Sequence, residues 1–406
     1  MSLKSTESWL RNLVVCLFGS ITTNMAMTLM QPFMPLYVKQ LGVSGDTAIL
    51  QWSGIAYSAT FVTAGLVAPL WGHLGHHYGR KAMLVRASFG MAVCVLLMGL
   101  VSGIGQLVGL RLLVGLAGGY SSGATILVAV QTPKERSGYA LGLLASGVMA
   151  GNLVGPLAGG VLPPLIGIRA TFLSAGALIF IAFLATLLLV TEVPRPAETR
   201  DSKGGSWSLV PHKSVVVAML VAGFMLMIAN MSIVPIITDY VQGLVSGTDR
   251  VTFIAGLVMS AAALGSVLSS SLLGRLADRI GHLRVVLFSL MAGALLLIPQ
   301  AFVTASWQVI ALRFLMGLAL GGLLPCISAV IRHNVPEHFV GTVLGYSLSS
   351  QFAGQFVGPL IGGFVGGHIG LPYVFFVTSA LTLASAIFTW RATSASISTS
   401  STSLHS

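Results

Sequence analysis

The sequence predicts an all-α membrane protein whose twelve transmembrane helices form two pseudo-symmetric six-helix bundles. Three observations predict this fold: an apolar composition, twelve apolar segments of membrane-spanning length, and an internal repeat. Of the 406 residues, 55% are hydrophobic and only 8% are charged, and the mean hydropathy is +0.91. Because a soluble domain carries about 25% charged residues, this composition excludes a soluble enzyme, a disordered scaffold and a secreted disulfide-rich protein.

The apolar segments follow one another along almost the whole chain. A bilayer core about 30 Å thick requires roughly 20 apolar residues in each crossing helix. By that measure the predicted spans are residues 12–38, 49–71, 82–101, 106–130, 138–166, 170–190, 214–241, 252–273, 285–303, 307–331, 341–367 and 371–391. The first span is not expected to be a cleaved signal peptide, because it is too long and contains Asn24, Gln31, Pro32 and Pro35.

The positive charges predict the orientation in the membrane. If both termini and the even-numbered loops face the cytoplasm, that side carries sixteen of the 21 Lys and Arg residues. The opposite side carries only Lys39, Arg169 and Arg250, and the remaining two, Arg111 and Arg313, lie within spans. Lys and Arg accumulate in cytoplasmic loops, so we expect a multi-pass protein of the cell (inner) membrane with both termini cytoplasmic. This distribution explains the net charge of +11 without a basic face for nucleic acid.

Polar segments divide the chain into predicted domains. Residues 191–213 contain Pro, Gly and charged residues and are expected to form a cytoplasmic linker. This linker separates an N-terminal six-helix bundle, residues 1–190, from a C-terminal one, residues 214–391. The remaining residues, 392–406, are mostly Ser and Thr and are expected to be a disordered tail.

Three motifs recur in the two halves at nearly the same distance. GHLGHHYGRK at 72–81 matches GRLADRIGHL beginning 202 residues later. RLLVGLAGG at 111–119 matches RFLMGLALGG, also beginning 202 residues later, and GPLAGG at 155–160 matches GPLIGG after 203 residues. Three matches at one period indicate that the two six-helix halves arose by duplication.

A duplicated twelve-span bundle with these motifs resembles the major facilitator superfamily. Within that superfamily the chain is similar to the twelve-span drug:proton antiporters, and most of all to the MdtG-type multidrug exporters. LGVSGDTAILQWSGI at 41–55 and GRLADRIG at 274–281 carry this narrower resemblance. The resemblance covers residues 10–391 and implies secondary active transport by alternating access. It does not specify the substrate.

The motif after the second span is a candidate cytoplasmic gate. The family pattern G-x-L-x-D-R-x-G-R-K implies a tight turn whose charges clasp the facing half. The matching residues are Gly72, His76, Gly79, Arg80 and Lys81, with Asp278, Arg279 and Gly281 in the second copy. His76 replaces the expected Asp, and we hypothesise that it makes closure pH-sensitive because an imidazole titrates near pH 6.5. The alternative is that this segment only anchors the topology through its positive charge.

Two arginines within spans are candidates for coupling transport to protons. A guanidinium inside the membrane is costly and needs partners, so it indicates a functional site. The resemblance implies that Arg111 belongs to the proton-coupling motif of the fourth span, and Arg313 is its repeat mate in the tenth. The alternative for both is a structural role, with the guanidinium satisfied by backbone carbonyls or reaching outward to the membrane surface.

The acidic residues add one candidate only. None of the ten Asp and Glu residues is expected at mid-membrane, and only Asp239, near the outer end of the seventh span, is placed to lie inside the protein. A position at the rim fits Asp239 equally well. Two buried arginines without a central acid predict a cavity that prefers anionic, zwitterionic or neutral substrates.

The fifth span carries a glycine pattern that the resemblance links to antiporters. Four glycines recur at a spacing of four residues, which places them on one helix face where another backbone can approach closely. The full motif consists of Gly147, Gly151, Gly155, Pro156, Gly159 and Gly160. Pro156 is expected to bend the helix, and the eleventh span repeats the pattern from Gly354 to Gly366. The alternative is generic helix packing.

Amide side chains within spans are the candidate substrate contacts. They are Asn24, Gln31, Asn152, Asn230, Gln351 and Gln355. Asn24 and Gln31 share a face of the first span, and Gln351 and Gln355 share a face of the eleventh. A single amide in such a helix serves as often as a hydrogen bond between helices, so this alternative stays open.

No pattern in the chain points to catalysis. There is no ATP-binding P-loop, no cluster with metal-ligand spacing and no nucleophile paired with a base. We therefore expect no enzyme activity, no cofactor and no metal. Cys16, Cys94 and Cys326 lie in apolar segments and are expected to be buried, reduced thiols.

Proton-coupled efflux of drugs or other small molecules is the favoured function. Its expected partners are a small-molecule substrate, protons and the lipid bilayer, and a monomer is the default because two halves enclose a complete pathway. A facilitator or importer of a small metabolite or organic anion is the alternative, and the glycine–proline motif weighs against it. A non-transporting receptor would need neither the repeat nor the buried polar residues.

Overall fold

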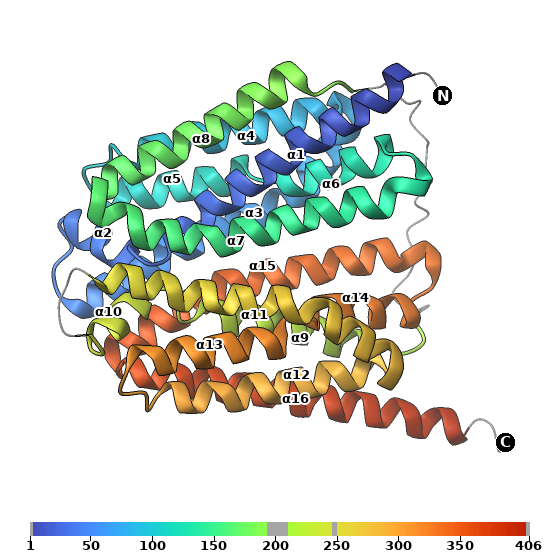
Figure 1. Cartoon of the computed structure of the whole chain (residues 1–406). Coiled ribbons are helices and arrows are strands. Elements are labelled where there is room, and N and C mark those ends of the chain that lie inside the picture. Colours follow the sequence, from blue (N-terminus) through green and yellow to red (C-terminus); the bar gives the residue numbers. More distant parts are fainter. Residues whose placement is uncertain (1–2, 193–209, 246–249, 403–406) are drawn as a thin grey trace. The chain divides into compact units, whose positions relative to one another are not determined.

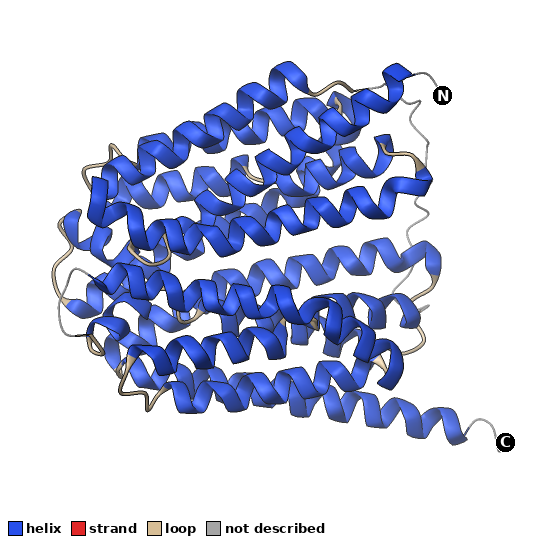
Figure 2. Ribbon diagram, in the orientation of Figure 1, coloured by secondary structure: helices blue, strands red, loops and turns tan. Residues whose placement is uncertain are grey.

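The computed structural model describes residues 3–192, 210–245 and 250–402. Within these ranges every regular element is a helix and no strand occurs (Figure 2). The prediction of an all-α protein is confirmed for this part of the chain. Most of the predicted linker, residues 193–209, lies outside the described residues.

The helices follow the order of the predicted spans (Figure 1). The first eight are α1 (Leu3–Leu29), α2 (Met34–Gln40), α3 (Asp46–Tyr78), α4 (Arg80–Met98), α5 (Ile104–Ala117), α6 (Tyr120–Gln131), α7 (Ser137–Ile166) and α8 (Ile168–Leu189). The others are α9 (Lys213–Met231), α10 (Ile237–Gln242), α11 (Val251–Ile280), α12 (His282–Gln300), α13 (Ser306–Leu320), α14 (Leu323–Asn334), α15 (Glu337–His368) and α16 (Leu371–Thr402).

The chain divides into two compact units. Unit 1 consists of Met1–Glu198 and Ile237–Ser260, and unit 2 consists of Thr199–Ile236 and Ala261–Ser406. In unit 1, α1 packs along α7, α3 along α5 and α4 along α8; in unit 2, α9 packs along α15 and α12 along α16. The boundaries of the two predicted bundles remain a prediction.

Ten helical segments in the described residues are long and apolar enough to cross a membrane. They coincide with ten of the twelve predicted spans. The remaining two, 49–71 and 341–367, lie within α3 and α15, which contain 33 and 32 residues. At 1.5 Å per residue either helix is longer than a bilayer core, and its crossing of the membrane stays a prediction.

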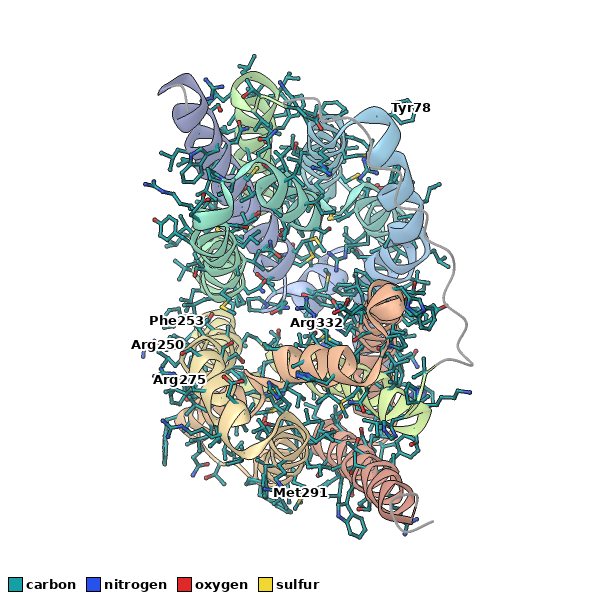
Figure 3. The ribbon with its side chains drawn as sticks, turned by 90° about the vertical axis from the view of Figure 1, so that its right-hand side faces the viewer. Tyr78, Arg250, Phe253, Arg275, Met291 and Arg332 are labelled. Carbon is teal, nitrogen blue, oxygen red and sulfur yellow. The ribbon has the colours of Figure 1, made fainter. Side chains whose placement is uncertain are left out.

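Many large apolar side chains point away from the protein. Phe253 on α11 and Met291 on α12 are 41% and 45% exposed, and both lie at the outer surface (Figure 3). A soluble protein rarely exposes contiguous apolar surface of this kind. Such side chains fit helices that face lipid.

Four of the predicted spans consist of two helices rather than one. These pairs are α1 with α2, α5 with α6, α9 with α10, and α13 with α14, and their breaks contain Pro32, Gly118–Gly119, Pro235 and Gly321–Gly322. Proline cannot donate the hydrogen bond that would continue a helix, and glycine tolerates the altered backbone. Each break in the first half has its counterpart in the second, so the internal repeat extends to the helix breaks.

The tight turn that the motif at 72–81 implies is confined to Gly79, and residues 72–78 are not part of it. These residues continue α3. The helix ends at Tyr78, and the following Gly79 has a left-handed backbone with φ of 85°. Gly281 has φ of 95° and forms the same one-residue turn between α11 and α12. Such φ values favour glycine, and the two turns are 202 residues apart in the sequence.

The disordered tail expected over 392–406 overlaps the end of α16, and its residues 403–406 lie outside the described residues. α16 continues to Thr402, so residues 392–402 are helical. The Thr393 hydroxyl donates to the carbonyl oxygens of Thr389 and Trp390, at 3.0 and 2.9 Å, which satisfies it within the helix. Serine and threonine can pair with the preceding turn in this way, so a polar composition did not end the helix.

Candidate functional site

The glycine face of α7 lies directly against the backbone of α1. A Cβ added at Gly151 would fall 2.6 Å from the carbonyl oxygen of Ile21, and one at Gly155 would fall 2.7 Å from that of Met25. Gly159 meets the backbone of α1 at Leu29 in the same way, whereas Gly147 meets the side chains of Leu17 and Ile21. The spacing of four residues therefore produces one continuous contact, as the sequence predicted from its periodicity.

The remaining residues of the motif lie in the same helix. Pro156 is buried inside α7 without ending it. Gly160 faces the start of α11, where its added Cβ would fall 2.8 Å from the carbonyl oxygen of Thr252. The motif therefore leaves no space for a side chain where α7 meets α1 or where it meets the start of α11.

The second copy of the glycine pattern makes the same contact within unit 2. Gly354, Gly358 and Gly362 of α15 lie against α9 and the residues that follow it. Gly362 approaches Ser232 and Pro235, whereas Gly159 approaches Leu29 and Pro32. All three positions are shifted by 203 residues. The two helix pairs are thus built alike.

Three of the predicted amide contacts, Asn24, Gln31 and Asn152, belong to unit 1. The Asn24 Nδ2 group donates to the Ser121 hydroxyl of α6 and to the Ser20 carbonyl, both at 2.7 Å. The Asn24 side chain also lies beside Gly151 of α7, next in sequence to Asn152. Asn24 and Asn152 are half-buried, and Gln31 is buried in the turn after α1. Asn24 therefore joins α1 to α6, which supports its role as a hydrogen bond between helices.

The other three amides belong to unit 2. Asn230 donates to the Leu226 carbonyl of its own helix at 3.1 Å. Gln351 donates to the Ser347 hydroxyl at 3.4 Å, and both Gln351 and Gln355 are half-buried on α15. Each unit thus carries half-buried amides on the helices that the sequence predicted.

Arg111 is held in the interior of unit 1. Its side chain is 1% exposed, and its Nε donates to the carbonyl oxygen of Ala56 on α3 at 3.0 Å. The guanidinium carbon lies 5.2 Å from the centre of the Tyr57 ring, within range of a cation–π interaction. Arg111 Nη1 and the Tyr57 hydroxyl are both buried without a hydrogen-bond partner. Arg111 therefore combines a structural contact with a donor that stays available.

Arg313 is buried with fewer partners. It lies on α13 with 2% exposure, and its Nη1 approaches the sulfur of Met316 at 3.9 Å. Nε and Nη2 are buried without a hydrogen-bond partner. An unsatisfied charged donor costs more free energy than a neutral one. Arg313 leaves two such donors unpaired and Arg111 leaves one, so the burial of Arg313 is less well compensated.

Asp239 occupies α10, beyond the end of the apolar segment Lys213–Met231. Its carboxylate is half-buried in unit 1, and its charged neighbours are Asp46 and Lys39. The neighbouring Thr238 donates to the Pro32 carbonyl at 2.8 Å, which ties α10 to the turn between α1 and α2. Asp239 is therefore closer to the predicted rim position than to the middle of a span.

Glu192 supplies a carboxylate to the predicted gating segment. It accepts the backbone N–H groups of Arg80 at 2.8 Å and of Lys81 at 3.0 Å. These residues begin α4, and a negative charge at a helix N-terminus is stabilising. The sequence pattern expected an acid at position 76, where His76 stands in α3. The side chains of residues 72–77 lie outside the described part of the structure.

A second set of hydrogen bonds fixes Glu192 in place. Asn12 of α1 pairs with both backbone groups of Thr191: its Nδ2 donates to the carbonyl at 2.7 Å, and its Oδ1 accepts the N–H at 3.0 Å. Gln131 of α6 also donates to that carbonyl at 3.1 Å. Glu192 and Asn12 were not predicted as site residues, and the one signal was a polar side chain at the start of an apolar segment.

The second copy of the gating motif differs from the first. Asp278 is exposed and pairs with His282, the first residue of α12, at 3.5 Å across the turn at Gly281. Arg279 is exposed in the last turn of α11, immediately before Ile280 and the turn at Gly281. The acid predicted at Asp278 is thus present and available at the surface.

The cysteines and candidate metal ligands add no further site. Cys16, Cys94 and Cys326 are free and buried, as predicted. Among the residues that the structure describes, no group of three or more His, Cys, Asp or Glu side chains is placed to hold a metal ion.

Comparison with known proteins places the chain in a family. A family model described as Major Facilitator Superfamily matches residues 16–249 and again residues 219–404. The chain is 38% identical over 386 residues to "Multidrug resistance protein MdtG" of Salmonella arizonae, which covers 95% of this chain and 96% of that protein. The protein of the same name from Salmonella typhimurium gives the same values.

Solved structures of transporters share the fold. A D-xylose–proton symporter superposes with a TM-score of 0.75, covering 94% of this chain and 97% of that one. A bacterial homologue of the human lysosomal transporter Spinster, inward-facing and occupied, gives 0.74 over 94% and 96%. Both are 15% identical to this chain, so they show the fold alone. The match to the family model and the 38% identity along nearly the whole sequence show that the chain is a membrane transporter of the Major Facilitator Superfamily, of the MdtG type.

Proposed function

We propose that this transporter exports drugs or other small amphipathic or anionic molecules across the inner membrane in exchange for protons, by alternating access. The observation that carries the proposal is the glycine–proline motif of α7, from Gly147 to Gly160, which leaves no space for side chains where α7 packs on α1 and on the start of α11. In this superfamily that motif resembles the one found in antiporters. The relatives named multidrug resistance proteins support export of drugs in particular.

Arg111 is the residue that we assign to coupling. It is buried, it retains an unpaired Nη1 donor, and its other contacts are a backbone carbonyl and an aromatic ring. A buried positive charge without a carboxylate partner attracts anions and disfavours nearby protonated groups. The charge on Arg111 therefore favours the binding of an anionic substrate and, when no anion is bound, the release of a proton from a nearby group.

Arg313 and Asp239 complete the proposed coupling set. Arg313 has two unpaired donors in unit 2, which adds to the preference for anionic, zwitterionic or neutral substrates. Asp239, half-buried on α10, is the carboxylate that we assign to proton uptake. The amides Asn24, Asn152, Gln31, Asn230, Gln351 and Gln355 are proposed substrate contacts.

The segments around Gly79 and Gly281 are the proposed cytoplasmic gate. Each glycine joins two long helices through a single residue. Arg80 and Lys81 are held by Glu192 in unit 1, while Asp278 and Arg279 are exposed in unit 2. Both termini are proposed to be cytoplasmic, and a monomer suffices because the chain carries both halves.

The test is proton movement in inside-out membrane vesicles with an acidic lumen. The compounds are an anionic, a neutral and a cationic fluorescent dye, each added outside the vesicles. We expect the anionic or neutral dye to trigger proton release from the lumen with the native protein, and Arg111→Ala to abolish it. Arg332→Ala, which removes an exposed arginine of α14, is the matched control and should retain release.

Each outcome has a defined meaning. Equal release from Arg111→Ala and the native protein would overturn the coupling assignment. A strong preference for the cationic dye would overturn the proposed substrate class. Uptake of a dye that neither requires nor dissipates the proton gradient would favour the alternative, a facilitator or importer of a small metabolite or organic anion. The lack of an acidic residue at mid-membrane would be consistent with that alternative.

A further inference from the structure

The break between α5 and α6 leaves backbone carbonyls at the end of α5 that need partners. α5 ends at Ala117, and Gly119 has φ of 101°, a left-handed value. The last carbonyls of a helix have no partner within it. Two side chains from other helices take these positions here: the Trp71 indole N–H donates to the Leu116 carbonyl at 2.8 Å, and Arg86 Nη2 donates to the Gly118 carbonyl at 3.0 Å.

Arg86 and Trp71 also contact each other. The guanidinium carbon of Arg86 lies 3.4 Å from the centre of the Trp71 ring. This stack places a positive charge at the carboxyl end of α5, where the helix dipole is negative. Arg86 Nε and Nη1 are buried and have no hydrogen-bond partner. The side chain is therefore held by one carbonyl and one ring, a contact that a change at the break would disrupt.

α4, which carries Arg86, touches both sides of the break. A Cβ added at Gly90 would lie 2.7 Å from the Cβ of Ala117, the last residue of α5. A Cβ added at Gly123 of α6 would lie 3.1 Å from Leu84. Arg86 lies between these two contacts in the sequence of α4, so it is placed where α5 and α6 meet.

The two helices are anchored to different neighbours. α5 is held by α3, because Thr60 and Thr63 donate to the carbonyls of Arg111 and Leu112 at 2.9 and 2.8 Å. α6 is held by α8, because the Tyr120 and Thr186 hydroxyls share a hydrogen bond of 2.8 Å. A change of angle at Gly118–Gly119 would move α3 and α5 relative to α6 and α8.

The corresponding break in the second half lacks this cap. Gly321 and Gly322 have φ of −63° and −91°, so neither is left-handed. Leu273 and Phe288 stand 202 residues after Trp71 and Arg86. Leu273 packs against Gly322 as an apolar side chain. The arginine–tryptophan cap is therefore specific to the first half and is not a requirement of the repeat.

We propose that Arg86 is a positioning residue for transport: stacked on Trp71, it caps α5 and sets the angle between α5 and α6, and thereby the position of Arg111 on α5. This inference rests on the proposed transport function only where Arg111 is concerned. The effect on the angle is independent of it. Losing the cap would allow the helix pair to adopt other angles.

A distance measurement tests the angle without any substrate. Spin labels are attached at Leu113 of α5 and Ile126 of α6, which are 49% and 50% exposed, in a protein whose three cysteines are replaced by Ala. Thirteen residues of helix span about 20 Å, a distance that pulsed electron resonance resolves. We expect Arg86→Gln to broaden or shift the distance distribution and Arg86→Lys, which keeps a charge and a donor, to restore it in part. Arg284→Gln, at an exposed arginine of α12, should leave it unchanged.

The transport arm uses the dye that releases protons in the vesicle assay. We expect Arg86→Gln to lower kcat about tenfold and to leave KM unchanged. A tenfold effect corresponds to the loss of one charge-assisted hydrogen bond from a single conformation. Trp71→Phe keeps the ring but removes the N–H, so its effect should be smaller.

An identical distance distribution in Arg86→Gln and the native protein would overturn the proposal, as would Arg86→Lys behaving no better than Arg86→Gln. If no dye moves protons while the distances still change, the proposed transport function fails and the positioning role stands.

Discussion

Gly151 of α7 lies so close to Ile21 of α1 that any side chain would collide with the backbone, since an added Cβ would be 2.6 Å from the Ile21 carbonyl oxygen. The Asn24 side chain of α1 approaches the same glycine, with its own Cβ 2.9 Å from the added Cβ. The glycine face of α7 thus positions one of the proposed substrate contacts as well as the two helices.

We therefore expect Gly151→Ala to separate α1 from α7 and to destabilise the protein by about 1–3 kcal/mol, the usual cost of inserting a methyl group into a packed interior. The measurement is the melting temperature of the purified protein in detergent. Gly142→Ala is the matched control, because Gly142 lies in the same helix with no atom within 4 Å of its added Cβ. A melting temperature in Gly151→Ala equal to that of Gly142→Ala would contradict this account of the helix contact.

Arg111 and Tyr57 give a prediction about the chemistry of the buried cation. Lysine lacks the planar fork that donates from Nε while stacking on a ring, so Arg111→Lys should lose transport at least about tenfold through loss of the hydrogen bond to Ala56. Tyr57→Phe keeps the ring and removes a hydroxyl that has no partner. Its melting temperature should equal or exceed that of the native protein.

The two variants are compared in the vesicle assay and in detergent. Tyr57→Leu, which removes the ring, serves as the control for the cation–π contact and should be less stable than Tyr57→Phe. Full transport by Arg111→Lys would show that charge alone suffices. A large loss of stability in Tyr57→Phe would show that the hydroxyl has a partner.

Glu192 is expected to stabilise the start of α4. Glu192→Gln keeps the size of the side chain and removes the charge that faces the N–H groups of Arg80 and Lys81, which should cost about 1 kcal/mol. The measurement is the melting temperature, with Glu135→Gln, an exposed acid in the turn before α7, as control. Equal melting temperatures for both variants would mean that the carboxylate contributes nothing to α4.

Much of the fold could be predicted from the sequence, because apolar periodicity and repetition report directly on helices in lipid. The glycine spacing in α7 likewise predicted a close helix contact, and Gly151 and Ile21 make it. The helix breaks were missed, because a span measured by hydropathy alone does not distinguish one helix from two. Pro32 and Gly118–Gly119 were visible in the sequence, but they interrupt the backbone and not the apolar character.

The site was less predictable, because its partners lie far apart in the chain. Glu192 reaches Arg80 across more than a hundred positions, and Arg86 meets Gly118 from another helix. No spacing rule within one helix reports such contacts. Arg111 could be selected because a charge in an apolar segment stands out, whereas Tyr57 beside it carries no signal that distinguishes it from other aromatic residues.

His76 carries the final prediction, which concerns pH. An ordinary imidazole is protonated below about pH 6.5, so acidification adds a positive charge to the segment that already contains Arg80 and Lys81. A carboxylate at the same position stays negative above about pH 4. The rate of transport by the native protein should therefore change between about pH 5.5 and 7.5, while that of His76→Asp should be flat over the same interval.

Initial rates in vesicles with a constant pH difference across the membrane measure this. His338→Asp, at an exposed histidine of α15, is the control and should keep the native profile. If His76→Asp also keeps that profile, the pH dependence originates elsewhere and the acid at Glu192 suffices for the gate.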